Sequence, residues 1–221
     1  MIKNADNWQV YLVIPACNEE AAISKVLAEI PGGVLQEIIV VDNGSTDHTA
    51  ARAAEAGATV LSEPRQGYGF ACLKGIGRVV DKSRGREQQT ILLFMDGDYS
   101  DYPAQMTEVL RPIKARGFQM VIGSRVLGKR QKGSLTPQQV FGNWLATRLL
   151  YLFYGMRFTD LGPFRAIRLD CLLRLAMQDK TYGWTVEMQI KAARHQLKCT
   201  EVPVDYRRRI GISKVSGTVK G

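Results

Sequence analysis

Short apolar runs alternate with segments of helical pattern over the first 125 residues, and turn-forming residues separate them. Runs of this length that are rich in Val, Ile and Leu are typical of strands buried on both faces. Strands that alternate with helices predict an α/β fold, a mainly parallel sheet covered by helices. The predicted strands are 10–14, 37–41, 58–61, 90–95 and 120–122. The predicted helices are 19–30, 46–56, 70–80 and 103–116.

Length and composition indicate one large domain or two small ones. The chain has 221 residues, 45% of them hydrophobic and 23% charged, which excludes disorder, collagen-like repeats and a disulfide miniprotein. The net charge of +9 predicts an anionic partner: nucleic acid, nucleotide phosphates or an acidic membrane surface. The four cysteines form no CxxC motif, and the N-terminal residues carry no apolar signal segment. We therefore expect reduced thiols in a cytoplasmic protein.

Polar and turn-forming residues follow each predicted strand at its carboxyl end. The five clusters are 15–19, 42–47, 63–67, 96–98 and 123–125. Tight strand-to-helix turns alone could require such residues. However, the ligand crevice of open α/β sheets lies at this same edge, so five clusters in succession predict a binding site there.

The motif Asp96-Gly97-Asp98 predicts a metal site. Alternate residues of a strand point to the same side, so the two carboxylates can converge on one hard cation, with Gly97 leaving room for a ligand. Mg²⁺ or Mn²⁺ bridging a diphosphate suits such oxygen ligands. The alternative is a pair of aspartates that cap the helix beginning at Pro103. Asp101 adds a third carboxylate nearby and favours the metal.

Two other motifs narrow the chemistry. Residues 42–47 follow a strand and open a helix, so Asp42 can accept from a ribose hydroxyl or base edge while helix amides face an anion. The alternative is that Ser45 or Asp47 is a simple helix cap. The 67–72 segment fails the dinucleotide fingerprint at Cys72, and no GxxxxGK[ST] loop is present. His48 and His195 are the only histidines, and neither follows a predicted strand directly, so Ser-His-Asp or Cys-His catalysis is poorly supported.

A basic stretch without any Asp or Glu runs from Val109 to Thr159. Its second half, 141–158, is apolar and aromatic but broken by polar residues, so it is too short to span a bilayer. We expect either a helix in the interface of an anionic membrane or a helix packed on the sheet with snorkelling basic residues. Its start is predicted at Thr136, with Gln139 completing a capping box. Nucleic acid is not expected, because no aromatic platform alternates with the charges.

Taken in order, the motifs VIPACNEE (13–20), VDNGSTD (41–47), DGD (96–98) and GSR (123–125) resemble the blocks of family 2 glycosyltransferases with the GT-A fold. The C-terminal half is similar to the dolichol-phosphate mannose and glucose synthase branch at TDLGPFRA (159–166), YGWTVEM (182–188), EVPV (201–204) and GISK (211–214). The resemblance covers nearly the whole chain. It implies a single domain, with 8–125 binding a nucleotide sugar and 126–221 facing acceptor and membrane.

The resemblance also implies residue roles. The nucleotide-sugar set is Pro15, Ala16, Asn18, Glu19, Asp42, Gly44, Asp47, Gly67, Asp96, Gly97 and Asp98, with Asp96 and Asp98 holding Mg²⁺ or Mn²⁺. The acceptor or phosphate set is Ser124, Arg125, Arg165, Arg208, Arg209, Ser213 and Lys214, and Asp98 and Arg125 are the implied catalytic residues. This chain departs from the family by carrying Ser100 in place of a frequent Gln, Asn43 in place of a second acid, and a shortened segment at Gly162-Pro163.

The implied reaction moves a hexose from a UDP- or GDP-linked sugar to a polyprenyl phosphate at the cytoplasmic face of a membrane, with a separate membrane subunit as a possible anchor. A phosphate acceptor is already an anion and needs no general base, whereas a hydroxyl acceptor would use Asp101, Asp160 or Glu187. Transfer to a soluble or glycerolipid hydroxyl is one alternative, and a non-catalytic nucleotide-sugar-binding subunit is another. For Arg125, the alternative to a phosphate contact is a salt bridge to a sheet-edge acid such as Asp101.

Overall fold

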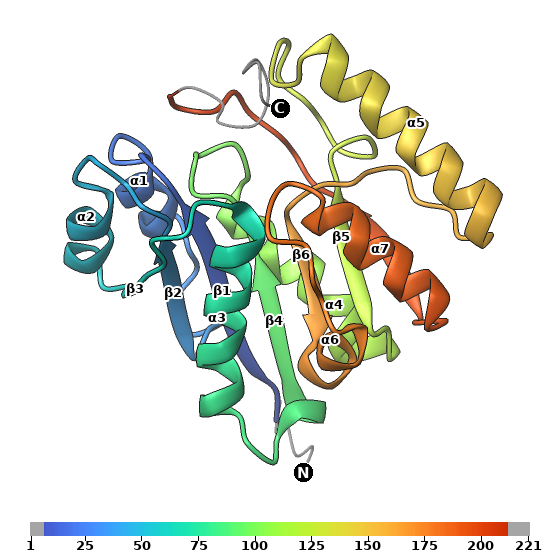
Figure 1. Ribbon diagram of the computed structural model, residues 1–221, viewed down its shortest axis with the longest axis horizontal. Coiled ribbons are helices and arrows are strands. Elements are labelled where there is room, and N and C mark those ends of the chain that lie inside the picture. Colours follow the sequence, from blue (N-terminus) through green and yellow to red (C-terminus); the bar gives the residue numbers. More distant parts are fainter. Residues whose placement is uncertain (1–6, 212–221) are drawn as a thin grey trace.

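The computed structural model describes residues 7–211 and contains one mixed sheet of seven strands between two layers of helices (Figure 1). The spatial order of the strands is β3-β2-β1-β4-β6-β5-β7. All neighbours pair in parallel except β6, which is antiparallel to both β4 and β5. The strands are β1 (Gln9–Ala16), β2 (Glu37–Asp42), β3 (Thr59–Ser62), β4 (Thr90–Phe94), β5 (Met120–Ser124), β6 (Arg165–Arg168) and β7 (Cys199–Pro203).

All five predicted strands are present, and the C-terminal half adds β6 and β7. The helices are α1 (Ile23–Ala28), α2 (Thr49–Glu55), α3 (Tyr68–Lys82), α4 (Met106–Arg116), α5 (Pro137–Tyr154), α6 (Leu169–Leu175) and α7 (Trp184–Arg194), with short 3-10 turns η1 (Glu87–Gln89) and η2 (Pro103–Gln105). Helices α1 and α2 begin three or four residues later than predicted, because residues 17–22 and 43–48 form turns that bond to one another.

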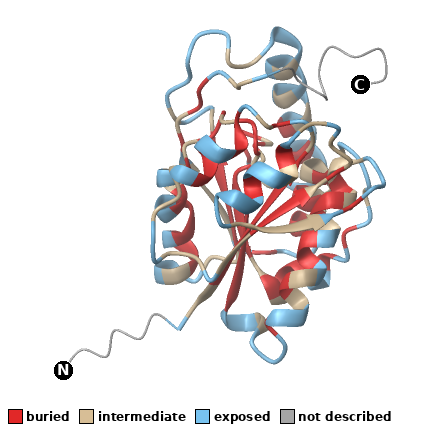
Figure 2. Ribbon diagram, turned by 90° about the vertical axis from the view of Figure 1, so that its left-hand side faces the viewer, coloured by how far each residue is buried: buried red, intermediate tan, exposed pale blue. Residues whose placement is uncertain are grey.

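Two hydrophobic layers cover the sheet, and strand periodicity divides β1 between them. Tyr11 and Val13 face the layer formed with α3, α6 and α7, whereas Leu12 and Ile14 face the layer formed with α1, α2 and α4. Successive strand side chains point to opposite faces, so an unbroken apolar run supplies both cores. Figure 2 shows the buried strands at the centre of the molecule and exposed helix surfaces outside them.

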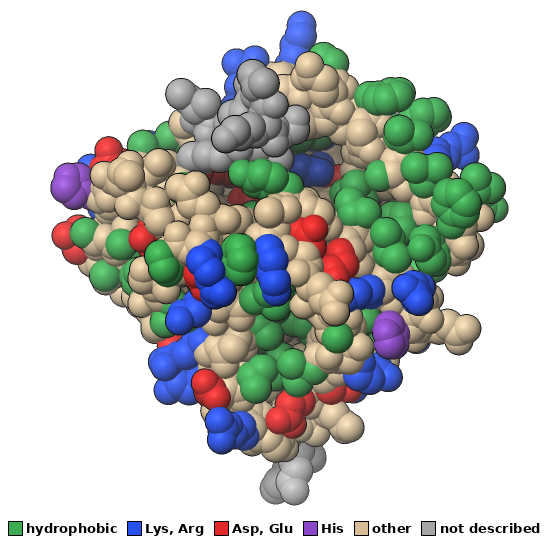
Figure 3. Space-filling model, viewed as in Figure 1, with side chains coloured by type: hydrophobic (Ala, Val, Ile, Leu, Met, Phe, Trp, Pro, Cys, Tyr) green, Lys and Arg blue, Asp and Glu red, His purple; other side chains and the backbone are tan. Residues whose placement is uncertain are grey.

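Helix α5 lies at one side of the molecule and leaves most of its apolar residues exposed. The predicted capping box is confirmed: the Gln139 amide N–H donates to the Thr136 hydroxyl at 3.3 Å, and the Thr136 amide N–H donates to the Gln139 side chain at 2.8 Å. Figure 3 shows hydrophobic side chains gathered over this helix. This exposure is at odds with a helix packed on the sheet by its apolar face. No helix among residues 7–211 has the length and apolar content needed to cross a bilayer.

Candidate active site

A pocket of about 360 Å³ opens at the carboxyl ends of β1 and β4, the edge predicted from the polar clusters. Its lining combines the turn after β1, the segment before α3, the DGD motif and one arginine from the C-terminal segment. The lining residues are Pro15, Ala16, Cys17, Asn18, Glu19, Asn43, Gln66, Gly67, Tyr68, Asp96, Gly97, Asp98, Tyr182 and Arg209. The pocket therefore brings together nine of the residues predicted from sequence: Pro15, Ala16, Asn18, Glu19, Gly67, Asp96, Gly97, Asp98 and Arg209.

The turns after β1 and β2 are joined by reciprocal hydrogen bonds. The amide N–H of Asn18 donates to the Ser45 hydroxyl at 2.9 Å, and the Asn18 side chain accepts from the Thr46 amide at 2.8 Å. Asn18 itself has a φ of 52°, a left-handed conformation that Asn tolerates better than most residues. Asp47 accepts from the amides of Thr49 and Glu20. Asn18 and Asp47 thus shape the rim of the pocket, and Asp47 does so without lining it.

Asn43 joins the β2 turn to the segment after β3. Its side-chain NH₂ donates to the carbonyls of Glu63 and Arg65 at 2.9 and 2.7 Å, and its side-chain oxygen accepts from the Gly67 amide at 2.8 Å. A carboxylate could not donate the first two bonds. The departure from the family pattern at this position therefore has a structural explanation.

The segment before α3 passes so close to residues 179–181 that only glycine fits. A Cβ on Gly67 would lie 2.2 Å from the Lys180 carbonyl oxygen, and Gly67 has a φ of 147°. The amides of Gly69 and Phe70 donate to the carbonyls of Thr181 and Lys180, both at 3.1 Å. This contact brings Tyr182, which is distant in sequence, to the mouth of the pocket.

Three carboxylates gather at the pocket: Asp96 and Asp98 line it, and Asp101 lies close to them without lining it. Asp96 accepts from the Tyr68 hydroxyl at 3.2 Å, and Asp98 accepts from the amide and hydroxyl of Ser100. Burial and the neighbouring charge of Asp98 raise the pKa of Asp96 to about 7. Burial, Asp96 and Asp98 likewise raise the pKa of Asp101, and one buried oxygen of Asp101 has no hydrogen-bond partner. The pKa shifts of Asp96 and Asp101 indicate concentrated negative charge that a cation would relieve.

These residues fit a divalent cation that takes its remaining ligands from a bound diphosphate. Carboxylate oxygens are the donors that Mg²⁺ and Mn²⁺ prefer, and the orphaned oxygen of Asp101 lies among them. Over the described part of the chain, no three His, Cys, Asp or Glu residues are arranged to hold a metal by themselves. Ser100 is engaged with Asp98 rather than positioned as an independent ligand.

Arg209 enters the pocket from the C-terminal segment. Its guanidinium donates to Glu19 at 3.0 Å and lies 3.4 Å from the Asp98 carboxylate. The segment is held in place by backbone bonds from Ile210 to Asp98 and from Arg207 to Ser100. By contrast, Arg208 points away and donates to the Lys132 carbonyl at 2.8 Å. Ser213 and Lys214 lie outside the described residues.

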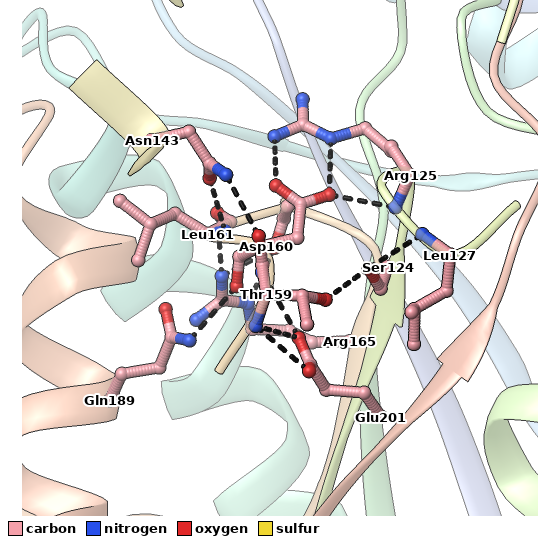
Figure 4. A network of polar contacts seen from close by, with 11 residues as sticks. Ser124, Arg125, Leu127, Asn143, Thr159, Asp160, Leu161, Arg165, Gln189 and Glu201 are labelled. Carbon is pink, nitrogen blue, oxygen red and sulfur yellow. Dashed lines mark hydrogen bonds and ion pairs between the residues drawn. The ribbon is translucent and has the colours of Figure 1, made fainter. Parts of the chain in front are cut away.

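Arg125 forms a buried ion pair with Asp160. For a structural role of Arg125 the expected partner was a sheet-edge acid such as Asp101, so the structure corrects the partner. Three donors of Arg125, its amide and two guanidinium nitrogens, reach the Asp160 carboxylate at 2.6 to 2.7 Å (Figure 4). Burial opposes ionisation of Asp160, but the hydrogen bonds and charge of Arg125 outweigh it and lower its pKa. Ser124 beside it pairs its hydroxyl with Thr159 at 2.6 Å. Neither Ser124 nor Arg125 lines the pocket.

Arg165 is a structural residue in this arrangement, in contrast to the predicted phosphate contact. It is 1% exposed and donates to the carbonyls of Leu161, Gly162 and Thr185. A guanidinium buried in this way needs all its donors paired, and backbone carbonyls supply the partners. Arg165 therefore holds the 161–162 turn and does not reach a surface ligand.

Three further predicted residues are Gly97, Asp42 and Gly44, and of these only Gly97 lines the pocket. Gly97 lines the pocket as predicted, and a Cβ there would lie 3.2 Å from an Ile14 methyl, so this glycine also packs closely on β1. The Asp42 side chain accepts from the Ser45 amide at 3.3 Å and does not line the pocket. Gly44 likewise lies outside it and has a φ of 73°, so its turn explains the residue.

Tyr68, Gln66 and Tyr182 line the pocket but were not predicted as site residues. Tyr68 is the first residue of α3 and follows the cluster after β3, so its place at the sheet edge was a usable signal. Tyr182 begins the YGWTVEM motif but follows no predicted strand, and its place at the pocket depends on the long-range contact of residues 180 and 181 with the start of α3.

Comparison with known proteins supports a common architecture. The family model of glycosyl transferase family 2 matches residues 11–173. An uncharacterised glycosyltransferase from Mycobacterium tuberculosis is 33% identical over 216 residues, which cover 96% of this chain and 92% of that protein. An undecaprenyl-phosphate mannosyltransferase from Micrococcus luteus is 30% identical over 226 residues, which cover 96% of this chain and 90% of that protein.

Among solved structures, glucosyl-3-phosphoglycerate synthase from Mycobacterium tuberculosis in complex with Mn²⁺, UDP and phosphoglyceric acid has a TM-score of 0.72 at 23% identity. The match covers 94% of this chain and 72% of that one. The same enzyme in complex with Mg²⁺ and UDP has a TM-score of 0.69 at 24% identity. At these identities the likeness is evidence of a shared fold.

Proposed function

We propose, from the premise that this chain belongs to glycosyl transferase family 2, that it transfers a hexose from a nucleotide-diphosphate sugar to a polyprenyl phosphate. The family and the α/β fold of GT-A glycosyltransferases expected from the sequence are confirmed, and the chain is accordingly a glycosyltransferase. The donor, the acceptor, the metal and the residue roles are parts of the proposal. In this proposal, residues 8–125 form the donor-binding part of the chain and residues 126–221 form the acceptor-facing part.

The observation that carries the proposal is the pocket that joins Asp96, Asp98 and Arg209 at the carboxyl edge of the sheet. Asn18 and Glu19 on the β1 turn would face the nucleoside. Arg209 would contact the diphosphate after its guanidinium leaves the carboxylates of Glu19 and Asp98. Asp96 and Asp98 would hold Mg²⁺ or Mn²⁺, which when bound stabilises the negative charge that develops on the departing diphosphate.

The choice of acceptor rests on the contacts of the three carboxylates that could act as general bases. Asp160 is held by Arg125, and Glu187 is held by Lys191 at 2.7 Å. Burial raises the pKa of each carboxyl, but the bonds and charge of the cation, together with backbone hydrogen bonds, outweigh burial and lower it. A carboxylate with a lowered pKa is a weak general base. Asp101 is buried and does not line the pocket. A phosphate acceptor needs no base, and the Micrococcus luteus relative is named for a polyprenyl phosphate.

A polyprenyl acceptor lies in a membrane, so the proposal includes peripheral association with the cytoplasmic face. The net charge of +9 and the acid-free stretch 109–159 support attraction to anionic headgroups. A separate membrane subunit is compatible with this arrangement and is not required by it.

The test is transfer of labelled sugar from a panel of UDP- and GDP-sugars, with Mn²⁺, to undecaprenyl phosphate in detergent. We expect label in the organic phase with one donor, and none with Asp98→Asn or in excess EDTA. Label that enters only a water-soluble hydroxyl acceptor would replace the acceptor assignment. Donor binding without any transfer would instead favour a non-catalytic nucleotide-sugar-binding subunit.

A further inference from the structure

Helix α5 departs from an ordinary surface helix, which buries its apolar stripe and exposes its polar one. The residues of α5 that face the protein are Gln139, Asn143, Ala146, Thr147 and Leu150, and three of these are polar. Its outer face, by contrast, exposes Val140, Phe141, Trp144, Leu145, Leu149, Tyr151, Leu152, Phe153 and Tyr154. Leu152 and Phe153 are 73% and 71% exposed. An apolar surface of this extent marks a contact with something outside the domain.

Charge around the outer face of α5 selects the kind of contact. The helix carries Arg148 and no acid, and Arg157 follows it within the acid-free stretch 109–159. A second copy packed on this face would cover Arg148 with a surface of the same helix that offers no compensating carboxylate. Anionic lipid headgroups complement these cations, and Trp and Tyr side chains favour the membrane interface. An anionic bilayer is therefore the occupant that the surface fits.

The inner face of α5 is bonded to the segment that positions Arg125. The Asn143 side chain donates to the Thr159 carbonyl at 2.9 Å and accepts from the Leu161 amide at 2.8 Å. These two bonds bracket Asp160, whose carboxylate holds Arg125 (Figure 4). The Glu201 carboxylate accepts from the amides of Thr159 and Asp160 on the other side of the segment. A movement of α5 relative to the sheet would therefore act on this segment through Asn143.

We propose that the outer face of α5 docks on an anionic bilayer and that Asn143 is a positioning residue, which transmits this docking to the Arg125–Asp160 pair. The docking names the surface for the membrane association of the proposed function, and the consequence for sugar transfer rests on that function; the transmission is argued from the contacts of Asn143 alone. Docking immobilises α5, so both Asn143 bonds persist and segment 159–161 is held more firmly. Without a bilayer, any movement of α5 relative to the sheet would strain both bonds at once.

Sedimentation with vesicles tests the docking. Wild type should bind phosphatidylcholine vesicles that contain phosphatidylglycerol, bind pure phosphatidylcholine vesicles weakly, and lose affinity with added salt. The double variant Leu152→Ser/Phe153→Ser should bind at least about tenfold more weakly, because its apolar contact with the bilayer is lost. The matched control is Leu173→Ser, which alters a 43% exposed leucine on α6 and should bind as wild type does. Equal binding to both vesicle types, or wild-type binding by the double variant, would overturn the docking.

Hydrogen–deuterium exchange tests the transmission without relying on catalysis. Anionic vesicles should slow exchange of a peptide containing residues 159–161 in wild type. Asn143→Ala should bind vesicles equally well, yet exchange faster in this peptide and show no response to vesicles. Asn143→Asp, which keeps the acceptor for Leu161 but loses the donor to Thr159, should respond to an intermediate degree and serves if Asn143→Ala does not fold. An unchanged peptide in vesicle-bound wild type, or a full response in folded Asn143→Ala, would refute the transmission.

Kinetics then separate this inference from the proposed function. With polyprenyl phosphate in anionic vesicles, Asn143→Ala should lower kcat while leaving the KM for the nucleotide sugar unchanged. If wild type transfers no sugar to polyprenyl phosphate although the vesicle response of segment 159–161 is present, the proposed acceptor is wrong and the coupling stands. If transfer occurs without that response, the coupling is wrong and the proposed function stands.

Discussion

The replacement Asp96→Asn should stabilise the ligand-free protein, and increasingly so as the pH rises. Asp96 has a pKa of 3.8 in an unfolded chain and about 7 in the folded one, chiefly because it is buried and next because Asp98 is close. The folded state thus holds a proton that the unfolded state releases. The stability associated with neutral Asp96 is fully present below about pH 4 and is lost as the pH rises through about 7.

The size of this effect follows from the two pKa values of Asp96. Each unit of difference is worth about 1.4 kcal/mol. Relative to its value at strongly acidic pH, the free energy of unfolding is therefore lower by roughly 2 kcal/mol at about pH 5, where only the unfolded chain has released the proton, and by roughly 4 kcal/mol at about pH 8, where both states have. Asparagine has no such titration and still accepts from the Tyr68 hydroxyl. The difference in unfolding free energy between variant and wild type should therefore grow by roughly 2 to 3 kcal/mol between these pH values.

Urea unfolding in EDTA at about pH 5 and about pH 8 measures this change directly. Glu63→Gln is the matched control, because hydrogen bonds from Arg65 lower the pKa of Glu63 to about 2. The contribution of ionised Glu63 to the free energy of unfolding is complete above about pH 5. The effect of Glu63→Gln should therefore be the same at both pH values. If the effect of Asp96→Asn were equally flat, the raised pKa of Asp96 and the crowding of negative charge at the pocket would both be refuted.

Three other substitutions test the site. Asp98→Asn should abolish Mn²⁺-dependent UDP binding in calorimetry with little change in Tm, and unchanged binding would refute the metal assignment. Arg125→Lys should lower turnover at least about tenfold and reduce unfolding free energy in urea by about 1–3 kcal/mol, because lysine cannot make the paired bonds to Asp160; wild-type kinetics and stability would contradict this. Gly67→Ala should cost about 1–3 kcal/mol of unfolding free energy, since its Cβ would meet the Lys180 oxygen at 2.2 Å, and an unchanged urea midpoint would disprove the close contact.

Features set by neighbouring residues were predictable from the sequence alone. The five strands of the first 125 residues are continuous apolar runs, and the start of α5 is encoded in Thr136 and Gln139. The pocket members on the β1 turn and in the DGD motif were also identified, because residues that directly follow parallel strands meet at one sheet edge. In each case the signal spans only a few residues.

Strands β6 and β7 were missed because each is short and lacks a continuous apolar run. β6 reads RAIR and β7 reads CTEVP, and no residue of β7 is buried. Their pairing partners, rather than their own composition, make them strands: β6 inserts antiparallel between β4 and β5. Pairing over such distances leaves little trace in local sequence.

The chemistry of the second half was decided by contacts between distant segments. Arg125 pairs with Asp160 rather than with the nearby Asp101, and Arg165 is buried among carbonyls instead of facing an acceptor. Arg209 reaches Glu19 across nearly the whole chain. The local sequence around an arginine does not reveal whether its guanidinium contacts a phosphate, a carboxylate or a carbonyl. Only the order of strands in the sheet brings one partner within hydrogen-bonding distance and removes the others.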